Sequence, residues 1–498
     1  MKKSLIISEI LITSWRNQLG KLTAGNPVII ATLWLFVLIA CISLFLINKE
    51  FVYPLFSELS TDPKGLLIVF TLFLANISLV ISALLAFFIM ISPTQTYLDH
   101  YLAMMPVNRG QKMMGYYFPL IAITTGLAAL LYLPMAFPFI LRGSISFTAG
   151  ALVVAGVLFH ILMMVLFHLI VYILLYILLE RFFWISPFFG KITASSFMVL
   201  GSVVTFFATF QSLQPERVDM PINHSNALIL ILRDPLQGKL GVGELLWMVA
   251  VLFGIVFLTW LLYWLTGFSQ SVHQVNKYVW LKHWPFGNHP FTVYFAQELK
   301  QTVRQSENVI FALFFVLVSI SVVILVRGTE IKLDALFMAL VPLLVWFAAS
   351  LFAQNSYGRT QPTHWLRQVV PVPRIVWLLS KMAANFTFTT FVAILLFVVL
   401  SFGSDHLPFL SFLRHTVDGL FLTLLFTWIG VVFPYSEEYP YSSAVSTILL
   451  MVILLPVYYG MQKLLLIAPR ELIPYMGLTG CLLMMYLIYQ TDHWRSSP

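Results

Sequence analysis

The feature that most constrains this chain is a series of long apolar runs separated by short polar segments. Of its 498 residues, 60% are hydrophobic and only 10% are charged, whereas soluble proteins are about one quarter charged. Such a composition leaves too little polar material to cover a large water-soluble globule. A bilayer core of about 30 Å needs roughly 20 apolar residues per helix, and helices satisfy their own backbone polar groups in lipid. We therefore expect an all-α, polytopic membrane protein.

The apolar runs predict about twelve membrane-spanning helices. The first six cover residues 28–47, 65–91, 113–141, 146–179, 192–213 and 244–266. The other six cover residues 309–327, 333–354, 376–403, 410–433, 443–463 and 471–489. If the N-terminus is cytoplasmic, most of the 28 lysines and arginines fall in cytoplasmic segments, as the positive-inside rule requires. We expect both termini on the cytoplasmic side.

A short amphipathic segment precedes the first predicted span of each half. Residues 1–22 carry apolar side chains at three- and four-residue steps, namely Ile7, Leu11, Trp15, Leu19 and Leu22. Residues 293–308 carry Glu298, Lys300 and Arg304 on one face, with Tyr294, Phe295 and Leu299 on another. This pattern is typical of a helix that lies in the membrane interface. We predict such an interfacial, or elbow, helix at the start of each half.

A short motif also recurs, between the second and third spans of each half. It contains a Pro-Val pair and an arginine, in "PVNR" (Pro106, Val107, Arg109) and in "PVPR" (Pro371, Val372, Arg374). The repetition predicts two six-helix repeats. We divide the chain into a first transmembrane domain at 1–266, a cytoplasmic linker at 267–290 and a second transmembrane domain at 291–498.

The residue types of this motif suit a docking contact. Proline ends the incoming helix and fixes the direction of the chain, and valine offers an apolar knob to a partner's groove. Arginine pairs with an acidic surface or with lipid phosphate. The alternative is a basic cytoplasmic loop that only orients the protein in the membrane. Two copies at the same place in each half favour the docking contact.

The sequence carries none of the familiar catalytic motifs. The GxxxxGK[ST] pattern that cradles nucleotide phosphates is absent, as are the HExxH zinc motif and the GxSxG elbow. We therefore expect no catalytic residue, cofactor or metal in this chain. Two alternatives stay open. An integral membrane enzyme that modifies a lipid or polymer needs clustered polar residues at one membrane face, and an ion-coupled secondary transporter needs buried acids.

Two histidines, His160 and His168, lie eight residues apart within the fourth predicted span. They project within about 80° of each other on a helix. They either line a polar translocation path or form neutral, hydrogen-bonded contacts between helices. Two apolar pieces at 226–235 and 463–472 are too short to cross a bilayer. These are either re-entrant or interfacial helices, or plain loops.

The repeated motif resembles a stretch of the ABC-2-type permeases of ABC transporters. In that family the motif follows the second membrane helix of a six-helix domain, forms a cytoplasmic coupling helix and leads into the third helix. Lys381 stands where the family often has lysine, whereas the first copy has Tyr116 there. Gly115 and Ser380 keep a small residue just before that position.

The resemblance implies a function for the whole chain. It implies the permease subunit of an ABC exporter, with two six-helix domains fused in one chain, in a bacterial cytoplasmic membrane. The substrate expected for such exporters is a peptide, an antimicrobial or a lipid-like compound. ATP and Mg²⁺ would bind to a separate ATP-binding subunit, present in two copies. The residues implied in coupling to that partner are Pro106, Val107, Arg109, Pro371, Val372, Arg374 and Lys381.

Overall fold

The structure is a computed structural model of the chain. Apart from a few isolated positions, it describes residues 2–22, 63–91, 107–142, 147–182, 187–212, 242–266, 284–329, 335–360, 372–402, 409–432 and 473–496. Every regular element in these ranges is a helix, and no strand occurs among them. This result confirms the all-α prediction.

The helices of the first half match the predicted spans closely. They are α1 (Lys2–Leu22), α4 (Pro63–Ile91), α6 (Arg109–Arg142), α7 (Phe147–Phe182), α8 (Pro187–Ser212) and α10 (Val242–Thr266). Two of them begin at a proline, which is favoured at the first helical position because its missing N–H has no partner there. The predicted span 28–47 and the short piece 226–235 lie outside the continuously described residues.

The second half is built from shorter pieces. They are α11 (Pro290–Arg304), α12 (Ser306–Thr329), α13 (Ala335–Ser350), the 3₁₀-helix η3 (Leu351–Asn355), α14 (Ser356–Thr360), α16 (Arg374–Ser401), α17 (Phe409–Arg414), α18 (Thr416–Val432) and α20 (Ile473–Ser496). The predicted span 443–463 and the short piece 463–472 lie outside the described residues.

Two predicted spans of the second half each correspond to more than one helical element. The run 333–354 divides into α13 and η3, where the chain packs so closely on α18 that Gly430 lies against the backbone of Gln354. The run 410–433 breaks between α17 and α18 at His415, whose carbonyl accepts the N–H of Gly419 at 2.9 Å. The second break falls in a polar stretch, where Nδ1 of His415 lies 2.7 Å from Oδ2 of Asp418.

Six helices in the described part of the chain are long and apolar enough to cross a membrane, as a multi-pass membrane protein requires. They are α4, α6, α7, α8, α10 and α16. Large apolar side chains also face outward. On α10, Phe253 is 72% exposed and Val256 is 66% exposed. Such a surface is a liability in water and suits a helix that contacts lipid.

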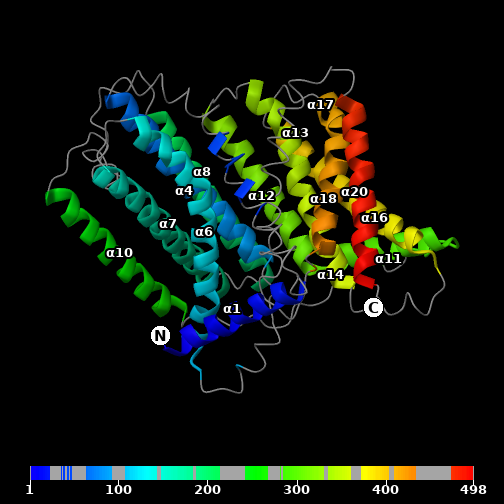
Figure 1. Cartoon of the computed structure of the whole chain (residues 1–498), viewed down its shortest axis with the longest axis horizontal. Helices are drawn as coiled ribbons and strands as arrows, with labels where there is room; N and C mark the ends of the chain where they lie inside the picture. Colours follow the sequence, from blue (N-terminus) through cyan, green and yellow to red (C-terminus); the bar gives the residue numbers. More distant parts are fainter. Residues whose placement is uncertain are drawn as a thin grey trace.

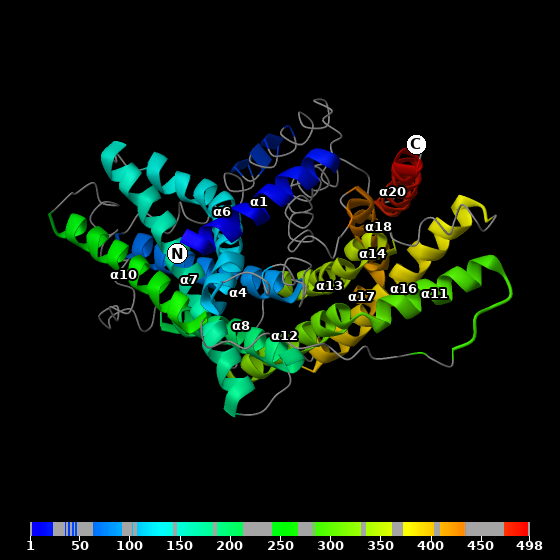
Figure 2. The ribbon, with the colours of Figure 1, turned by 90° about the horizontal axis from the view of Figure 1, so that it is seen from below.

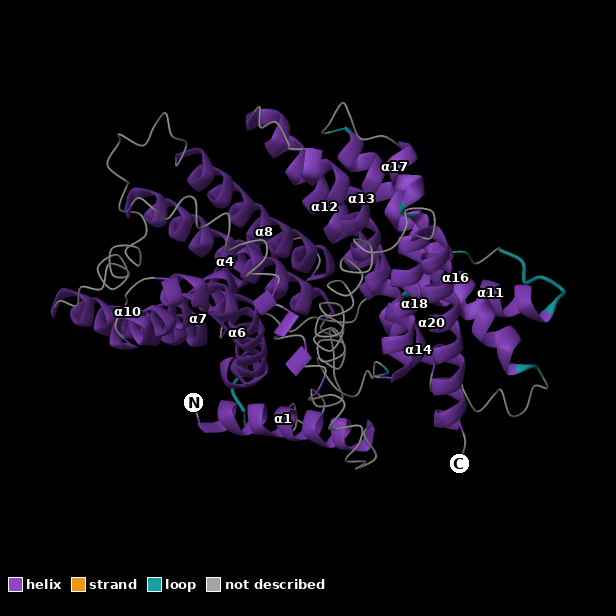
Figure 3. Ribbon diagram, turned by 45° about the horizontal axis from the view of Figure 1, so that its top comes forward, coloured by secondary structure: helices purple, strands orange, loops and turns teal. Residues whose placement is uncertain are grey.

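Within each half the helices pack side by side, and most run between the same two ends of the molecule (Figure 1). In the first half α4 packs on α6, α7 and α8, and α10 packs on α7. In the second half α13 packs on α16 and α18, and α20 packs on α18. Helix α1 lies across one end of the bundle, and α20 ends at that same end (Figures 1 and 3).

The two halves meet along α12. This helix packs on α8 and touches α4, and Figure 2 shows it between the two groups of helices. The rings of Phe87 on α4 and Phe311 on α12 meet edge to face with centroids 5.4 Å apart. One hydrophobic core cluster therefore continues from the first half into the second.

The close packing of α18 on η3 gives a test of the fold. A Cβ at Gly430 would overlap the backbone carbonyl oxygen of Gln354, which cannot swing away as a side chain would. Overpacking of this kind costs about 1–3 kcal/mol. We predict that Gly430→Ala lowers the thermal unfolding midpoint of the detergent-solubilised protein, measured by differential scanning fluorimetry. Gly254→Ala is the control, because nothing lies within 4 Å of its Cβ position. Equal midpoints for the two variants would contradict the η3 packing.

Candidate functional site

The first copy of the repeated motif leads directly into α6. We name Val107, Asn108 and the first two turns of α6 the first corner. The chain is non-helical at Val107 and Asn108, and the helix begins at Arg109. The N–H of Asn108 donates to Oε1 of Gln111 at 3.2 Å, which is one half of a capping box. The N–H of Lys112 closes the first turn on the Asn108 carbonyl at 3.0 Å.

Helix α1 crosses α6 at Gly115. A Cβ at this position would lie 2.7 Å from Cβ of Ile7 and 3.2 Å from the carbonyl oxygen of Ser4. Real Cβ atoms do not approach a neighbour as closely as the first of these distances, so the crossing requires glycine. The small residue noted in the sequence is thus the point at which α1 contacts α6.

An apolar cluster seals this crossing. Ile7, Leu11 and Leu102 are buried together, and Val107 and Tyr116 pack against them. Val107 was predicted to offer a knob to a partner. In the structure it is half-buried against the chain's own apolar cluster, so only part of its surface is available to another protein.

The second copy of the motif leads into α16 in the same way. We name Val372, Pro373 and the first two turns of α16 the second corner. Pro373 has φ −55° and ψ 131° and stands just ahead of the helix. Its carbonyl accepts the N–H of Val376 at 3.0 Å, and the helix begins at Arg374.

Helix α11 crosses α16 at Ser380, which stands at the same place after the motif as Gly115 does in the first half. The Ser380 hydroxyl lies 3.1 Å from the carbonyl oxygen of Phe291 on α11 and 2.7 Å from that of Val376 on its own helix. In both halves, therefore, a small residue of α6 or α16 lies close to the backbone of the helix that crosses it, α1 or α11.

The two crossings differ in the pair of side chains beside the small residue. Leu11 of α1 and Glu298 of α11 stand at corresponding steps from the crossing, and so do Tyr116 and Lys381. In the first half the contact is apolar. In the second half Nζ of Lys381 lies 2.8 Å from Oε2 of Glu298, and the two residues are 1% and 4% exposed. The second crossing therefore depends on a buried ion pair.

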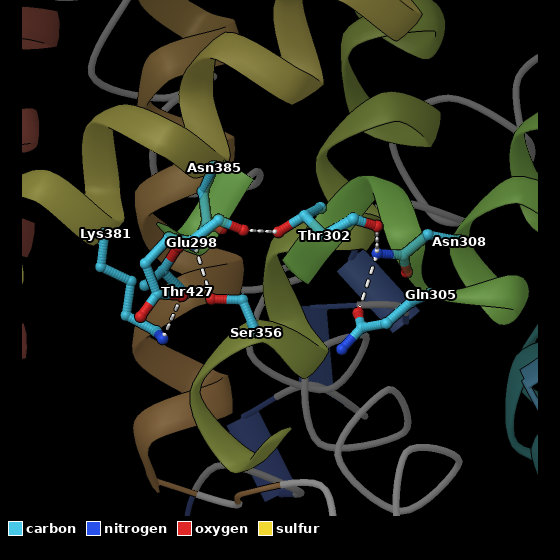
Figure 4. A network of polar contacts seen from close by, with 8 residues as sticks. All are labelled: Glu298, Thr302, Gln305, Asn308, Ser356, Lys381, Asn385 and Thr427. Carbon is cyan, nitrogen blue, oxygen red and sulfur yellow. Dashed lines mark hydrogen bonds and ion pairs between the residues drawn. The ribbon is translucent and has the colours of Figure 1, made fainter. Parts of the chain in front are cut away.

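This ion pair belongs to a larger group of polar contacts (Figure 4). On the α11 side, Oγ1 of Thr302 donates to the Glu298 carbonyl at 2.9 Å. Nδ2 of Asn308 lies 2.9 Å from the Thr302 carbonyl and 3.2 Å from Oε1 of Gln305. These bonds hold the break between α11 and α12 at Gln305, where the backbone leaves the helical conformation.

On the other side, one turn after Lys381, a buried amide joins three helices. Nδ2 of Asn385 on α16 lies 2.9 Å from Oγ of Ser356 on α14 and 3.3 Å from Oγ1 of Thr427 on α18 (Figure 4). Polar side chains of this kind fix the register of helices that are otherwise apolar and free to slide.

The start of α16 is also tied to the end of α20. Nε of Arg374 lies 3.1 Å from Oδ2 of Asp492, and the hydroxyl of Tyr357 donates to Oδ1 of the same carboxylate at 2.5 Å. The Asp492 side chain is wholly buried, whereas that of Arg374 is 30% exposed. The ring of Tyr357 meets that of Trp377 edge to face, and Nζ of Lys381 lies 5.2 Å from the Trp377 ring centroid. A continuous set of contacts thus links Asp492 to the ion pair.

The predicted coupling residues have different surroundings. Pro106 and Pro371 lie outside the described residues. Arg109 is the first residue of α6, and only its backbone is described. Arg374 is partly exposed but already paired within the chain, and Lys381 is buried. A separate coupling helix would have to lie in the segments just before Val107 and Val372, which are not continuously described.

The two histidines lie inside the first half and join α7 to its neighbours. Nε2 of His160 lies 3.2 Å from the carbonyl oxygen of Leu74 on α4. Nε2 of His168 lies 2.9 Å from Oγ of Ser202 on α8, and its Nδ1 lies 2.7 Å from the carbonyl oxygen of Met164. Both imidazoles are buried. These contacts favour the interpretation of His160 and His168 as helix–helix contacts, and a role in translocation stays a prediction.

Glu298 and Lys300, which the sequence analysis placed together on the charged face of the second amphipathic segment, are both buried. Glu298 turns toward Lys381 of α16, and Lys300 turns toward Trp284 and Phe286. Asp492 and Tyr357 were not singled out at all. The chain has only 20 acidic residues in 498. This low number was the one available signal, because it leaves few candidates for a buried ion pair.

Comparison with protein-family models and with curated protein sequences finds no match for this chain. Within the described residues, no group of three or more His, Cys, Asp or Glu side chains is arranged to hold a metal ion. The arguments for function therefore come from the two corners themselves.

The crossing at Gly115 is open to a direct test. We predict that Gly115→Ala pushes α1 away from α6, because the new methyl group would lie within 2.7 Å of Ile7. Hydrogen–deuterium exchange of peptides from residues 2–22 should then become faster. Gly126→Ala in the same helix is the control, since nothing lies within 4 Å of its Cβ position. Unchanged exchange in the Gly115 variant would exclude the close crossing.

The buried ion pair predicts strong coupling between two positions. Removing one partner of a buried ion pair costs about 3–5 kcal/mol, because the other charge remains buried, whereas replacing both by apolar groups costs far less. We predict that Glu298→Leu and Lys381→Tyr each lower the thermal midpoint strongly, and that the double variant, which copies the pair Leu11 and Tyr116, recovers most of the loss. Additive losses in this double-mutant cycle would show that the two side chains do not interact.

Proposed function

We propose that this chain is the membrane-spanning permease subunit of an ABC exporter. It would move a peptide, an antimicrobial or a lipid-like compound out of a bacterial cell, with ATP hydrolysed by separate ATP-binding subunits. The observation that carries the proposal is the matched pair of corners. In each half a Pro-Val and arginine motif leads into a helix, and nine residues after its proline a small residue meets a crossing interfacial helix.

The helix packing supports two six-helix repeats. Helix α1 packs on α6 as α11 packs on α16. Helix α4 packs on α6 and α7 as α13 packs on α16 and α18, and α10 packs on α7 as α20 packs on α18. Repeats of this scale are a common design among transporters. About twelve spans with both termini on one side fit this arrangement.

The surface of the corners supports a protein partner. Asn108 and Pro373 are exposed, and part of the Arg374 side chain is accessible. The first turn of α16 also exposes Ile375. An acidic partner groove with an apolar floor would complement these groups. The sequence has no phosphate-cradling motif, so ATP and Mg²⁺ would be bound by that partner, with one copy at each corner.

The mechanism follows from the connections of the corners. ATP binding would draw the two partner subunits together and push on both corners. The first corner would pass this motion to α6 through α1, and the second would pass it to α16, and through Asp492 to α20. A path between the halves would then open along α12, where they meet at Phe87 and Phe311.

The proposal predicts that charge reversal at one end of α6 lowers recovery of the ATP-binding subunit and that charge reversal at the other end does not. Purification of the chain from its native membrane should recover an ATP-binding subunit, and ATP hydrolysis should depend on it. Arg109→Glu, which reverses the charge at the first corner, should lower recovery of that subunit at least about tenfold, because tenfold corresponds to only about 1.4 kcal/mol. Arg142→Glu, at the opposite end of the same helix, is the control and should leave recovery unchanged.

The second corner needs a different control because Arg374 also pairs with Asp492. Asp492→Asn weakens that internal pair but leaves the positive charge at the corner. If Arg374 docks the partner, Arg374→Glu should lose the subunit and Asp492→Asn should retain it. If no ATP-binding subunit is recovered with the unaltered chain, or if both arginine variants retain it with full transport, the proposed function is wrong.

A further inference from the structure

The segment just ahead of α11 is exposed yet firmly held. We name residues 284–289 the strap. All of its residues are exposed, and Figures 2 and 3 show it at the outer edge of the second half, away from the first half. The N–H of Trp284 donates to the carbonyl of Leu281 at 3.2 Å. Nδ1 of His289 accepts the N–H of Phe291 at 3.3 Å and caps α11.

A buried lysine holds the strap on the helix. Lys300 is only 5% exposed. Its Nζ donates to the carbonyl of Trp284 at 2.5 Å and lies 3.8 Å from the ring centroid of Phe286. A buried ammonium requires such partners, and here the strap supplies both a carbonyl oxygen and an aromatic face. Lys300 of α11 therefore fixes the position of the strap on that helix.

The strap presents aromatic side chains outward. Trp284 is 41% exposed and Phe286 is 54% exposed. Beside them lie the exposed polar residues Asn288 and His289. An apolar body with a polar edge is the combination found at the boundary between lipid headgroups and hydrocarbon.

The depth of the strap can be judged from α16. Its 28 residues extend about 42 Å at 1.5 Å per residue, which matches a bilayer of about 40–45 Å including headgroups. Ser380 stands six residues into this span and bonds the carbonyl of Phe291, so Phe291 lies about 9 Å from the end of the span. The hydrocarbon begins about 6 Å from that end. Phe291 is therefore about 3 Å inside the hydrocarbon, and the strap, just ahead of it, is near the boundary between headgroups and hydrocarbon.

We propose that the strap is a membrane anchor, with Trp284 and Phe286 inserted at the boundary between lipid headgroups and acyl chains and with Lys300 as the residue that holds them there. The anchor fixes the start of α11 relative to the bilayer surface. This inference goes beyond the proposed function, because it requires neither a partner protein nor ATP.

Site-directed fluorescence quenching tests the anchor. In a Cys41→Ala and Cys481→Ala background, Trp284→Cys is labelled with an environment-sensitive fluorophore and reconstituted in phosphatidylcholine–phosphatidylglycerol nanodiscs. Phe286 and the Lys300 contact to the backbone carbonyl remain in this variant. Nitroxide lipids labelled near the headgroup should quench the probe several-fold more than lipids labelled near the acyl end, and more than aqueous iodide.

Two reference positions calibrate the measurement. A probe at Phe253, exposed near the middle of α10, should respond most to the deep nitroxide. A probe at Asn108, exposed at the first corner, should respond most to iodide. Lys300→Met should raise quenching of the Trp284 probe by iodide and lower its quenching by the shallow nitroxide, because the strap is then no longer held on α11. Lys300→Arg keeps a cation and should leave both quenching values unchanged.

Two results would overturn the inference. One is a Trp284 probe that responds to iodide as strongly as the Asn108 probe while ignoring the shallow nitroxide, since the strap would then lie in water. The other is a probe that Lys300→Met does not move. If Trp284→Cys fails to reconstitute, the label at Phe286→Cys provides the same comparison of shallow nitroxide with iodide.

Discussion

Lipid offers no hydrogen bonds, and this constraint governs the whole structure. Backbone groups must be satisfied within helices, so the described part of the chain is helical throughout its regular elements. The same constraint applies to polar side chains. The buried groups of the second half, above all Glu298 and Lys381, pair with one another and form specific ties between helices. Apolar packing alone would leave these helices free to slide, because lipid tails compete equally well for apolar contact.

The two halves meet this constraint in different ways at one shared position. Both place a small residue where the interfacial helix crosses, but the first half relies on a steric fit at Gly115 and the second on hydrogen bonding at Ser380 and an ion pair. The proposed partner would therefore act on two corners that are alike in layout and differ in the contact that holds each crossing.

Much of the fold was predictable because helix length and hydropathy dominate in a membrane. The spans at 65–91, 113–141 and 244–266 and both interfacial segments correspond to helices of the structure. The sequence did not reveal which face of α11 turns inward, because a charged residue with a buried partner looks the same in sequence as one in water. Glu298 is the clear case. The interruption at η3 was hidden as well, since it coincides with a tertiary contact to Gly430, whereas the break at His415 falls in a polar stretch that also holds Arg414 and Asp418.

The carboxylate of Asp492 has a consequence for how this protein can change. It lies in the last turns of α20, yet its partners Arg374 and Tyr357 belong to the start of α16 and to α14. The Asp492 side chain is wholly buried, so a substitution of Arg374 or Tyr357 leaves its carboxylate without one of its partners in a place that water does not reach. Substitutions at the three positions should therefore be coupled, so natural variants should keep or replace them together. More than one hundred residues separate the first position from the last.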